Sequence, residues 1–299
     1  HRRRLCRHCR LLKLGRYECA PFLFAVFCVK CGFSWLIGIC AALAFHAGAI
    51  NTQFMIRLSE IPTTPPDDLD RDDIEDKTKE LQERLGDLQK VLYAEQKHSV
   101  LVIFQGMDAS GKDGAVKHTF KDCHPHGLNV YSFKKPTDEE LAHDFLWRVH
   151  KQVPPKGMIQ VFNRSHYEDI LIQRVHGWID DEHVHRRMAA INAFEELLAF
   201  DNNTHIFKFY LHLSYEQQKE ELQERIDEPE KHWKHNPNDW KEREHWDTYR
   251  KYYEYAINES RIPWTIVPVD KRWYRNYIVV KMLVERLEAL NMQYPPLPI

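Results

Sequence analysis

The residues with the clearest chemical role lie at 106–114, Gly-Met-Asp-Ala-Ser-Gly-Lys-Asp-Gly. Their spacing is that of a phosphate-binding P-loop, in which backbone N–H groups and a helix N-terminus hold an anion and the lysine adds a positive charge. Asp113 stands where an ordinary NTPase has the Ser or Thr that holds magnesium, and Asp108 places a carboxylate inside the loop. The residues predicted to bind phosphate here are Gly106, Gly111, Lys112, Asp113 and Gly114.

A second polar segment, Asn-Arg-Ser-His-Tyr-Glu-Asp at 163–169, directly follows an apolar run. Its position is that of a Walker B motif beside the P-loop, but Asn163 replaces the usual aspartate. Arg164 offers a planar fork that suits a pair of phosphate oxygens. The carboxylates that hold magnesium around phosphates would then come from Asp108, Glu168 or Asp169. The alternative interpretation is a helix N-terminus with a surface salt bridge.

A third segment, 225–245, is highly charged and is interrupted by two prolines. Arg225, Lys231 and Lys234 are spaced so that they could close over a polyanion, which predicts a lid that shields phosphoryl transfer from water. A solvated helical face is the alternative. This segment contains no cysteine, and its histidines do not have the compact His-x3-His spacing. The sequence therefore does not indicate a zinc site here. Further candidates for a phosphate channel, with surface charge as their alternative, are Lys134, Lys135 and Arg148.

The rest of the chain must position these segments, and its apolar runs alternate with helical patterns. Strands are expected at 100–104, 129–133, 158–162, 205–213 and 265–269. Helices are expected at 74–92, where apolar residues recur every three or four positions, and at 115–121, 139–151, 168–175, 183–200 and 274–290, with a charged helical region at 215–259. This alternation predicts an α/β fold with a parallel sheet covered by helices on both faces. Ligands of such folds bind at the carboxyl ends of the strands, where the first two polar segments lie.

Charge and cysteine content change near Met55. Residues 1–54 hold eight Lys or Arg against one acidic residue, together with six of the seven cysteines. Residues 55–299 carry 34 basic and 43 acidic residues. The net charge of -2 gives no reason to expect a nucleic-acid partner. A single cysteine in the main body indicates a reducing compartment, so the cytoplasm is the expected location.

Residues 1–54 allow three specific interpretations. The Cys-x-x-Cys pairs at 6–9 and 28–31 have the spacing of a zinc ribbon. The uncharged stretch 31–50 is long enough to span a bilayer. An Arg-rich start, an apolar stretch and Ala-Gly-Ala at 47–49 are typical of a signal peptide.

The expectation we favour for this segment is translated sequence upstream of a true start at Met55. The chain opens on His1, and every motif described above follows Met55. The catalytic domain is therefore expected at 55–299, and contact with a membrane is expected only if residues 1–54 belong to the mature protein.

The motifs together resemble those of the polyphosphate kinase 2 family. Residues 106–114 are similar to the family's Walker A form, and Phe162–Asp169 resembles its Walker B segment. Glu-Pro-Glu-Lys-His-Trp-Lys at 228–234 resembles its lid, and the segment from Pro263-Trp264 to Arg272-Trp273 resembles its C-terminal block. The resemblance runs in matching order from Arg57 to Leu290.

The resemblance implies a three-layer P-loop kinase fold, similar to that of thymidylate kinase, with a helical lid. It implies reversible phosphoryl transfer between inorganic polyphosphate and nucleotides, converting AMP or ADP to ATP. Magnesium is the implied metal, with manganese as an alternative. A homo-oligomer is expected because relatives often associate.

The resemblance also implies roles for individual residues. Asp108 would help to hold metal or activate the acceptor, Lys112 would bind the transferring phosphate, and Arg164 would stabilise the developing charge. The nucleotide-binding residues would be Asn163, Arg164 and Glu168, of which Glu168 would also help to hold the metal. The polyphosphate contacts would be Arg225, Lys231 and Lys234.

Positions 163 and 168 bear on the branch of the family. Other branches carry Asp at the first position and Asn at the second, whereas this chain has Asn163 and Glu168. That combination resembles the class III branch, whose members phosphorylate both nucleoside mono- and diphosphates.

Two other functions stay open. An ATP-dependent nucleoside-monophosphate kinase of similar fold is disfavoured by Asp113, and the preferred phosphoryl donor would decide the question. A non-catalytic nucleotide-binding module, or a regulatory module tethered to a membrane by the N-terminal segment, would bind nucleotide without turnover.

Overall fold

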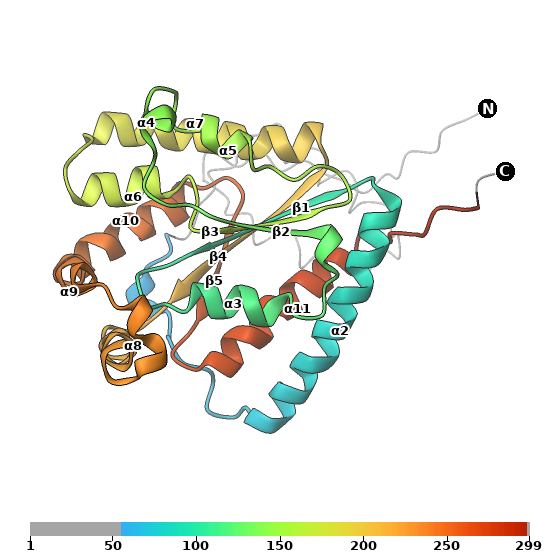
Figure 1. Ribbon diagram of the computed structural model, residues 1–299, viewed down its shortest axis with the longest axis horizontal. Helices are drawn as coiled ribbons and strands as arrows, with labels where there is room; N and C mark the ends of the chain where they lie inside the picture. Colours follow the sequence, from blue (N-terminus) through green and yellow to red (C-terminus); the bar gives the residue numbers. More distant parts are fainter. Residues whose placement is uncertain (1–54, 298–299) are drawn as a thin grey trace, which may run out of the picture. The chain divides into compact units, whose positions relative to one another are not determined.

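The computed structural model describes residues 55–297, and its centre is a sheet of five parallel strands (Figure 1). The order of the strands is β2-β3-β1-β4-β5, which places β1 in the middle. Their bounds are β1 Ser99–Gln105, β2 Leu128–Ser132, β3 Ile159–Asn163, β4 Thr204–His212 and β5 Trp264–Pro268. All five strands were predicted, with bounds that differ by one residue at most.

Helices cover both faces of the sheet, so the domain has three layers (Figure 1). One layer contains α2 Arg71–Glu95, α3 Lys112–Thr119 and α11 Arg272–Glu288. The other contains α6 Glu168–Val175, α7 Asp181–Asp201 and α10 Trp246–Glu259. The remaining helices are α4 Asp138–Leu141, α5 Trp147–His150, α8 Tyr215–Asp227 and α9 Pro237–Glu242, with 3-10 turns η2 Leu58–Glu60, η3 Pro125–Gly127, η4 Pro229–Lys234 and η5 Arg243–His245. The predicted α/β fold with a covered parallel sheet is confirmed.

The central strand shows why the sheet is covered on both sides. All seven residues of β1 are buried. Leu101 and Ile103 pack against the layer of α6, α7 and α10, whereas Val100, Val102 and Phe104 pack against the layer of α2, α3 and α11. Successive side chains of a strand point to opposite faces, so an unbroken apolar run is the pattern of a strand between two helical layers.

The periodic apolar residues of the predicted helix at 74–92 form one buried face of α2. Asp70 caps the start of the helix, because its side chain accepts the backbone N–H of Asp73 at 3.0 Å. Ile74, Leu85 and Leu92 are buried, and α2 packs on α11. The apolar face is therefore covered by the domain itself.

The helix predicted at 139–151 is wrong, because this stretch forms two single turns, α4 and α5. Thr137 and Glu140 make a capping box that begins α4. Asp144 Oδ1 then accepts the backbone N–H of Leu146 at 3.0 Å. A side chain that bonds to nearby backbone competes with the helical hydrogen bonds, so the chain turns between α4 and α5.

A cluster of polar side chains is buried between β4 and the helices α6 and α7. Lys208 Nζ lies 2.7 Å from Glu195 Oε2 and donates a hydrogen bond to Tyr167 Oη, also at 2.7 Å. Tyr167 Oη donates to Glu195 Oε1 at 2.9 Å, and Ser260 Oγ lies 3.1 Å from the same hydroxyl. Each buried charge has a partner, which is the condition under which buried ions are tolerated. The cluster also fixes Tyr167, which directly precedes Glu168.

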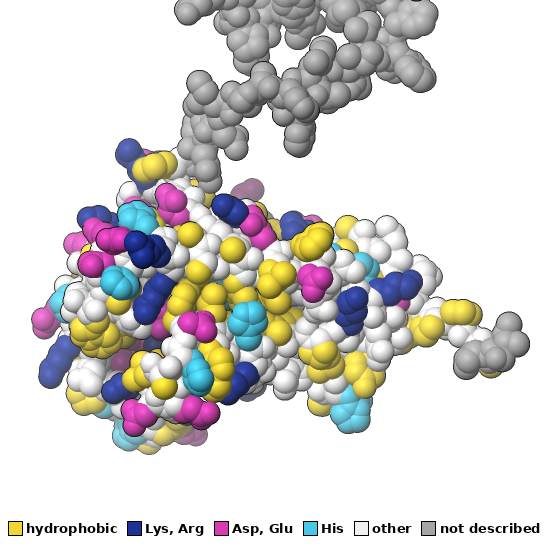
Figure 2. Space-filling view, turned by 90° about the horizontal axis from the view of Figure 1, so that it is seen from above, with side chains coloured by type: hydrophobic (Ala, Val, Ile, Leu, Met, Phe, Trp, Pro, Cys, Tyr) yellow, Lys and Arg dark blue, Asp and Glu magenta, His cyan; other side chains and the backbone are white. Residues whose placement is uncertain are grey.

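On the face seen in Figure 2, acidic and basic side chains are interspersed and apolar side chains are exposed between them. Trp178, Leu197 and Phe200 are among the exposed apolar residues of the domain. Within residues 55–297, no helix has the length and hydropathy needed to cross a membrane. The interpretations of residues 1–54 as a membrane span, a signal peptide, a zinc ribbon or, as we favour, translated upstream sequence all concern a segment outside the described residues.

Replacing Glu195 by Gln should destabilise the domain strongly, because Lys208 would stay buried without a negative partner. The free energy of unfolding, measured by urea denaturation, should fall by about 3–5 kcal/mol. The control is Glu196→Gln. Glu196 pairs with Arg261 at the surface at 2.7 Å, so its loss should cost less than about 1 kcal/mol. Equal losses in the two variants would contradict the role given to the buried pair.

Candidate active site

The P-loop lies between the end of β1 and the start of α3, and its backbone passes close to neighbouring atoms. A Cβ at Gly106 would lie 2.8 Å from Ser110 Oγ and 2.9 Å from the carbonyl oxygen of Leu211. Gly111 has a φ of +80° and precedes the first residue of α3. A side chain at either position would be strained, so the spacing of the glycines follows from the shape of the loop.

Arg275, in the first turn of α11, supports this loop from the side. Its Nη1 donates to the carbonyl oxygen of Gly111 at 3.1 Å, and a Cβ at Gly111 would collide with the same atom. Arg275 is buried, and no carboxylate within residues 55–297 forms an ion pair with it. Burial lowers the pKa of its guanidinium to about 10, and the positive charge of Arg272 adds to this effect. A buried cation without a carboxylate partner is well suited to an anionic ligand.

Lys112, the lysine of the P-loop, is buried and turned toward its own loop. Its Nζ donates to the carbonyl oxygens of Gly106 at 2.7 Å and Met107 at 2.9 Å. Burial lowers the pKa of Lys112 to about 8, with a further contribution from the nearby charge of Arg164. The ammonium group is thus held by neutral acceptors, and an anion in the loop would be a stronger partner.

The segment after β3 lies beside the P-loop, as predicted. The backbone N–H of Arg164 donates to the carbonyl oxygen of Phe104 in β1 at 3.0 Å. The Arg164 side chain forms an ion pair with Asp108 at 2.5 Å. Arg164 has a φ of +62° and Ala109 a φ of +65°, a conformation uncommon for residues other than glycine. Strained backbone of this kind clusters at functional sites.

Glu168 and Asp169 face different surroundings, although they are neighbours in sequence. Burial raises the pKa of Glu168, while the positive charges of Arg164 and Lys112 lower it. The buried Asp169 pairs with Arg148 at 3.2 Å and accepts a hydrogen bond from Gln173 at 2.8 Å. Asp169 and Arg148 therefore satisfy each other inside the domain, and neither lines the pockets described next.

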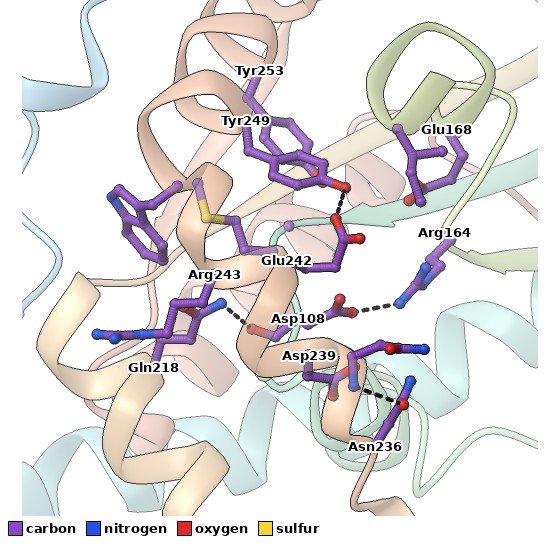
Figure 3. A pocket seen from close by; sticks show the side chains of 15 residues that line it. Asp108, Arg164, Glu168, Gln218, Asn236, Asp239, Glu242, Arg243, Tyr249 and Tyr253 are labelled. Atoms are coloured by element: carbon purple, nitrogen blue, oxygen red, sulfur yellow. Dashed lines mark hydrogen bonds and ion pairs between the residues drawn. The ribbon is translucent and has the colours of Figure 1, made fainter. Parts of the chain in front are cut away.

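The first pocket, here called the aromatic pocket, has a volume of about 240 Å³ and lies between the P-loop and the helices α9 and α10 (Figure 3). Its aromatic residues are Trp246, Tyr249 and Tyr253. Gln218 donates to the carbonyl oxygen of Asp108 at 2.9 Å, and its Oε1 is buried without a hydrogen-bond partner among the described residues. The other lining residues are Gly106, Met107, Asp108, Arg164, Glu168, Ile172, Asn236, Asn238, Asp239, Glu242 and Arg243.

The second pocket, here called the basic pocket, has a volume of about 610 Å³ and contains most of the predicted phosphate ligands. Its Lys and Arg side chains are Lys112, Lys134, Arg164, Arg225, Lys231, Lys234, Arg272 and Arg275. Its carboxylates are Asp108, Asp113, Glu221, Glu224 and Asp239. The pocket thus has an excess of positive charge, although residues 55–299 as a whole are acidic.

The segment predicted as a lid connects the two pockets. Its Lys234 forms an ion pair with Asp113 of the P-loop helix at 3.5 Å, and Asn163 donates to the same carboxylate at 2.7 Å. Arg225 pairs with Asp239, which lines both pockets, at 2.7 Å. The predicted residues of the P-loop, the lid segment and the positions 163, 164 and 168 all line one pocket or the other, whereas the candidate carboxylate Asp169 does not.

Several lining residues were not predicted, notably Arg275, Gln218 and the aromatic residues of α10. The position of Arg275 in the sequence could have indicated its role, because it follows β5 and the carboxyl ends of parallel strands meet at one edge of the sheet. Gln218 gave no such signal, since a glutamine on a charged helix has the pattern of a solvated residue. Of the further channel candidates, Lys134 lines the basic pocket, whereas Lys135 and Arg148 do not.

The P-loop on the central strand, the adjoining strand end and the cation-lined pocket define this protein as a P-loop kinase. The family model described as Polyphosphate kinase 2 (PPK2) matches residues 68–295, and the chain belongs to that family. The resemblance found in the motifs is therefore confirmed over most of the described domain.

Individual relatives agree with this assignment. The chain is 50% identical over 218 residues to the AMP/ADP-polyphosphate phosphotransferase of Meiothermus ruber, covering 72% of this chain and 81% of that protein. It is 45% identical over 228 residues to the ADP-polyphosphate phosphotransferase of Rhodopseudomonas palustris, covering 71% and 78%. The crystal structure of a polyphosphate kinase 2 from Arthrobacter aurescens TC1 matches with a TM-score of 0.79 and 40% identity, covering 82% of this chain and 89% of that one.

The buried charge of Lys112 should affect the free energy of unfolding even when no substrate is present. Because its pKa is lowered from 10.5 to about 8 on folding, the buried ammonium costs stability below pH 8. Lys112→Met should therefore raise the free energy of unfolding at pH 7, by about 3 kcal/mol at most. The gain should shrink between pH 8 and 10.5, where the folded wild type loses the proton that the unfolded chain still holds.

Urea denaturation at several pH values would measure this effect. The control is Lys117→Met on the exposed side of the same helix, which should leave stability unchanged. A loss of stability in Lys112→Met at pH 7 would show that the ammonium supports the loop instead of straining it.

Proposed function

We propose that this protein transfers the terminal phosphoryl group of inorganic polyphosphate to AMP or ADP, forming ADP or ATP. The observation that carries the proposal is that two chemically different pockets adjoin each other and share Asp108 and Arg164, together with Asn236 and Asp239 of the lid segment. A polyanion suits the basic pocket and a nucleoside suits the aromatic pocket. The phosphates of the two substrates would then meet beside Asp108 and Arg164.

The lining of the basic pocket favours polyphosphate over ATP as the donor. Among the described residues that line it there is no Trp or Tyr, and its one Phe, Phe133, has a buried side chain, so that the small imidazole ring of His118 is the one exposed ring. A nucleotide donor would need a surface for its base, whereas a polyphosphate chain needs cations along its length. The eight Lys and Arg side chains of this pocket provide them.

The aromatic pocket suits the nucleoside part of the acceptor. Trp246 and Tyr249 offer ring faces for a base. The unpartnered Oε1 of Gln218 and the carboxylate of Glu242, which accepts a hydrogen bond from Tyr249 at 2.7 Å, offer acceptors for donor groups of the nucleoside. Figure 3 shows the labelled polar side chains distributed around the pocket.

Phosphoryl transfer depends mainly on positioning and charge stabilisation, and the residues between the pockets supply both. In this proposal, Lys112 binds the transferring phosphate and Arg164 stabilises the charge that develops on it. Asn163 holds Asp113, which in turn holds Lys234 of the lid segment. Arg225, Lys231 and Lys234 contact the rest of the polyphosphate chain.

Magnesium fits this arrangement as the metal, with manganese as an alternative. Asp108 and Glu168 both line the aromatic pocket beside Arg164. Magnesium is commonly held by one or two carboxylates together with substrate phosphates. When bound, magnesium would neutralise part of the phosphate charge.

Asn163 and Glu168 favour an enzyme that accepts both mono- and diphosphates. The Meiothermus ruber relative, whose name gives both AMP and ADP, supports this choice.

The test is to incubate the full chain with magnesium, polyphosphate and either AMP or ADP, and to follow nucleotides by chromatography. ATP should form from both acceptors. ATP from ADP alone would reject the broader acceptor range, and product from ATP plus AMP but not from polyphosphate would identify an ordinary nucleotide kinase.

Lys112→Ala and Asp108→Asn should each nearly abolish this turnover. Removing one group that stabilises transition-state charge commonly lowers kcat by about 100- to 1,000-fold. Initial rates with polyphosphate and ADP would measure the effect, and circular dichroism would check that the variants fold. Lys117→Ala is the matched control and should keep normal rates. Near-normal activity of either active-site variant would reject the assignment of the site.

A further inference from the structure

Several cations of the basic pocket already carry carboxylate partners, and one carboxylate serves two of them, Lys231 and Arg272. Lys231 of η4 pairs with Glu224 at 2.6 Å and with Glu228 at 2.7 Å. Arg272 of α11 pairs with Glu224 at 3.0 Å and with Glu221 at 2.8 Å. Glu224 therefore connects the lid segment to the helix that follows β5.

Glu224 is placed where an incoming anion would lie. It lines the basic pocket together with Lys231 and Arg272, and its side chain is 31% exposed. The hydrogen bonds from Lys231 and Arg272 lower the pKa of its carboxyl group, so it is ionised at neutral pH. Phosphate oxygens that approach either cation must compete with this carboxylate.

We propose that Glu224 is an internal competitor of polyphosphate, which the chain displaces from Lys231 and Arg272 when it binds. This inference rests on the proposed function, because it assumes that polyphosphate occupies the basic pocket. In this arrangement Glu224 keeps the two cations paired in the empty site. It weakens polyphosphate binding without touching the nucleotide.

A purely structural role for Glu224 makes the opposite prediction. If the carboxylate served only to hold η4 against α8 and α11, its loss would release Lys231 and Arg272 and weaken polyphosphate binding. If it competes with the substrate, its loss frees two cations for phosphate and strengthens binding. The sign of the change therefore separates the two roles.

The test is Glu224→Gln, together with Glu224→Ala, in the full chain. Both variants should lower the KM for polyphosphate by about three- to ten-fold, the size expected when two half-exposed ion pairs no longer compete. The KM for ADP should stay within two-fold of the wild-type value. Binding of polyphosphate alone, measured by calorimetry, should tighten by the same factor.

The dependence of the KM for polyphosphate on salt concentration provides a second test, because a purely structural role of Glu224 does not predict the change described here. In the wild type, polyphosphate replaces a carboxylate of the protein, whereas in the variants it replaces small anions from solution. The KM for polyphosphate should therefore rise more steeply with salt in Glu224→Gln than in the wild type, following the release of counterions.

The matched control is Glu220→Gln, which removes the same charge one turn earlier on α8. Glu220 is exposed and does not line the basic pocket, so the KM for polyphosphate should not change. An unchanged or raised KM in both Glu224 variants, with an active wild type, would overturn this inference alone. A wild type that forms no product from polyphosphate would overturn the proposed function as well.

Discussion

The backbone hydrogen bond from Arg164 to the carbonyl oxygen of Phe104 is the contact on which the rest of the site depends. It joins the ends of two adjacent parallel strands and fixes the Walker B segment beside the P-loop. The ion pair between Arg164 and Asp108 can form because the backbone has already brought the two segments together. The aromatic and basic pockets both begin at this pair, so the geometry of one strand junction sets the position of each substrate in the proposed reaction.

The electrostatics of the site are unusual for a domain with a net negative charge. Lys112 and Arg275 are buried against the P-loop with neutral acceptors, while the more exposed Lys231 and Arg272 of the basic pocket are paired with carboxylates. Buried cations without counter-ions cost stability, and exposed ion pairs contribute little. The site is therefore held together by the sheet, the buried cluster around Glu195 and the packing of the two helical layers, and its charges remain available for ligand.

The sequence predicted those parts of the fold and site whose signals are local. Apolar runs located all five strands, and short spacings after two of them located the P-loop and the Walker B segment. Contacts between distant residues could not be read in this way. Arg275 reaches Gly111 from 164 positions further along the chain, and the pairing of Asp169 with Arg148 removes two residues that had qualified as ligands by type. The break in the helix predicted at 139–151 depends on one side chain, Asp144, bonding to the backbone, which periodicity does not reveal.

The position of Lys112 links phosphate binding to protons. With a pKa of about 8, this lysine is only partly protonated in mildly alkaline solution while the loop is empty. An anion bound against it favours the charged form and so draws a proton from the solvent. By thermodynamic reciprocity, proton concentration and phosphate affinity then influence each other. A change of pH within the mildly alkaline range would therefore alter how strongly the protein holds phosphate, even though the proposed reaction moves a phosphoryl group and needs no titrating side chain of its own.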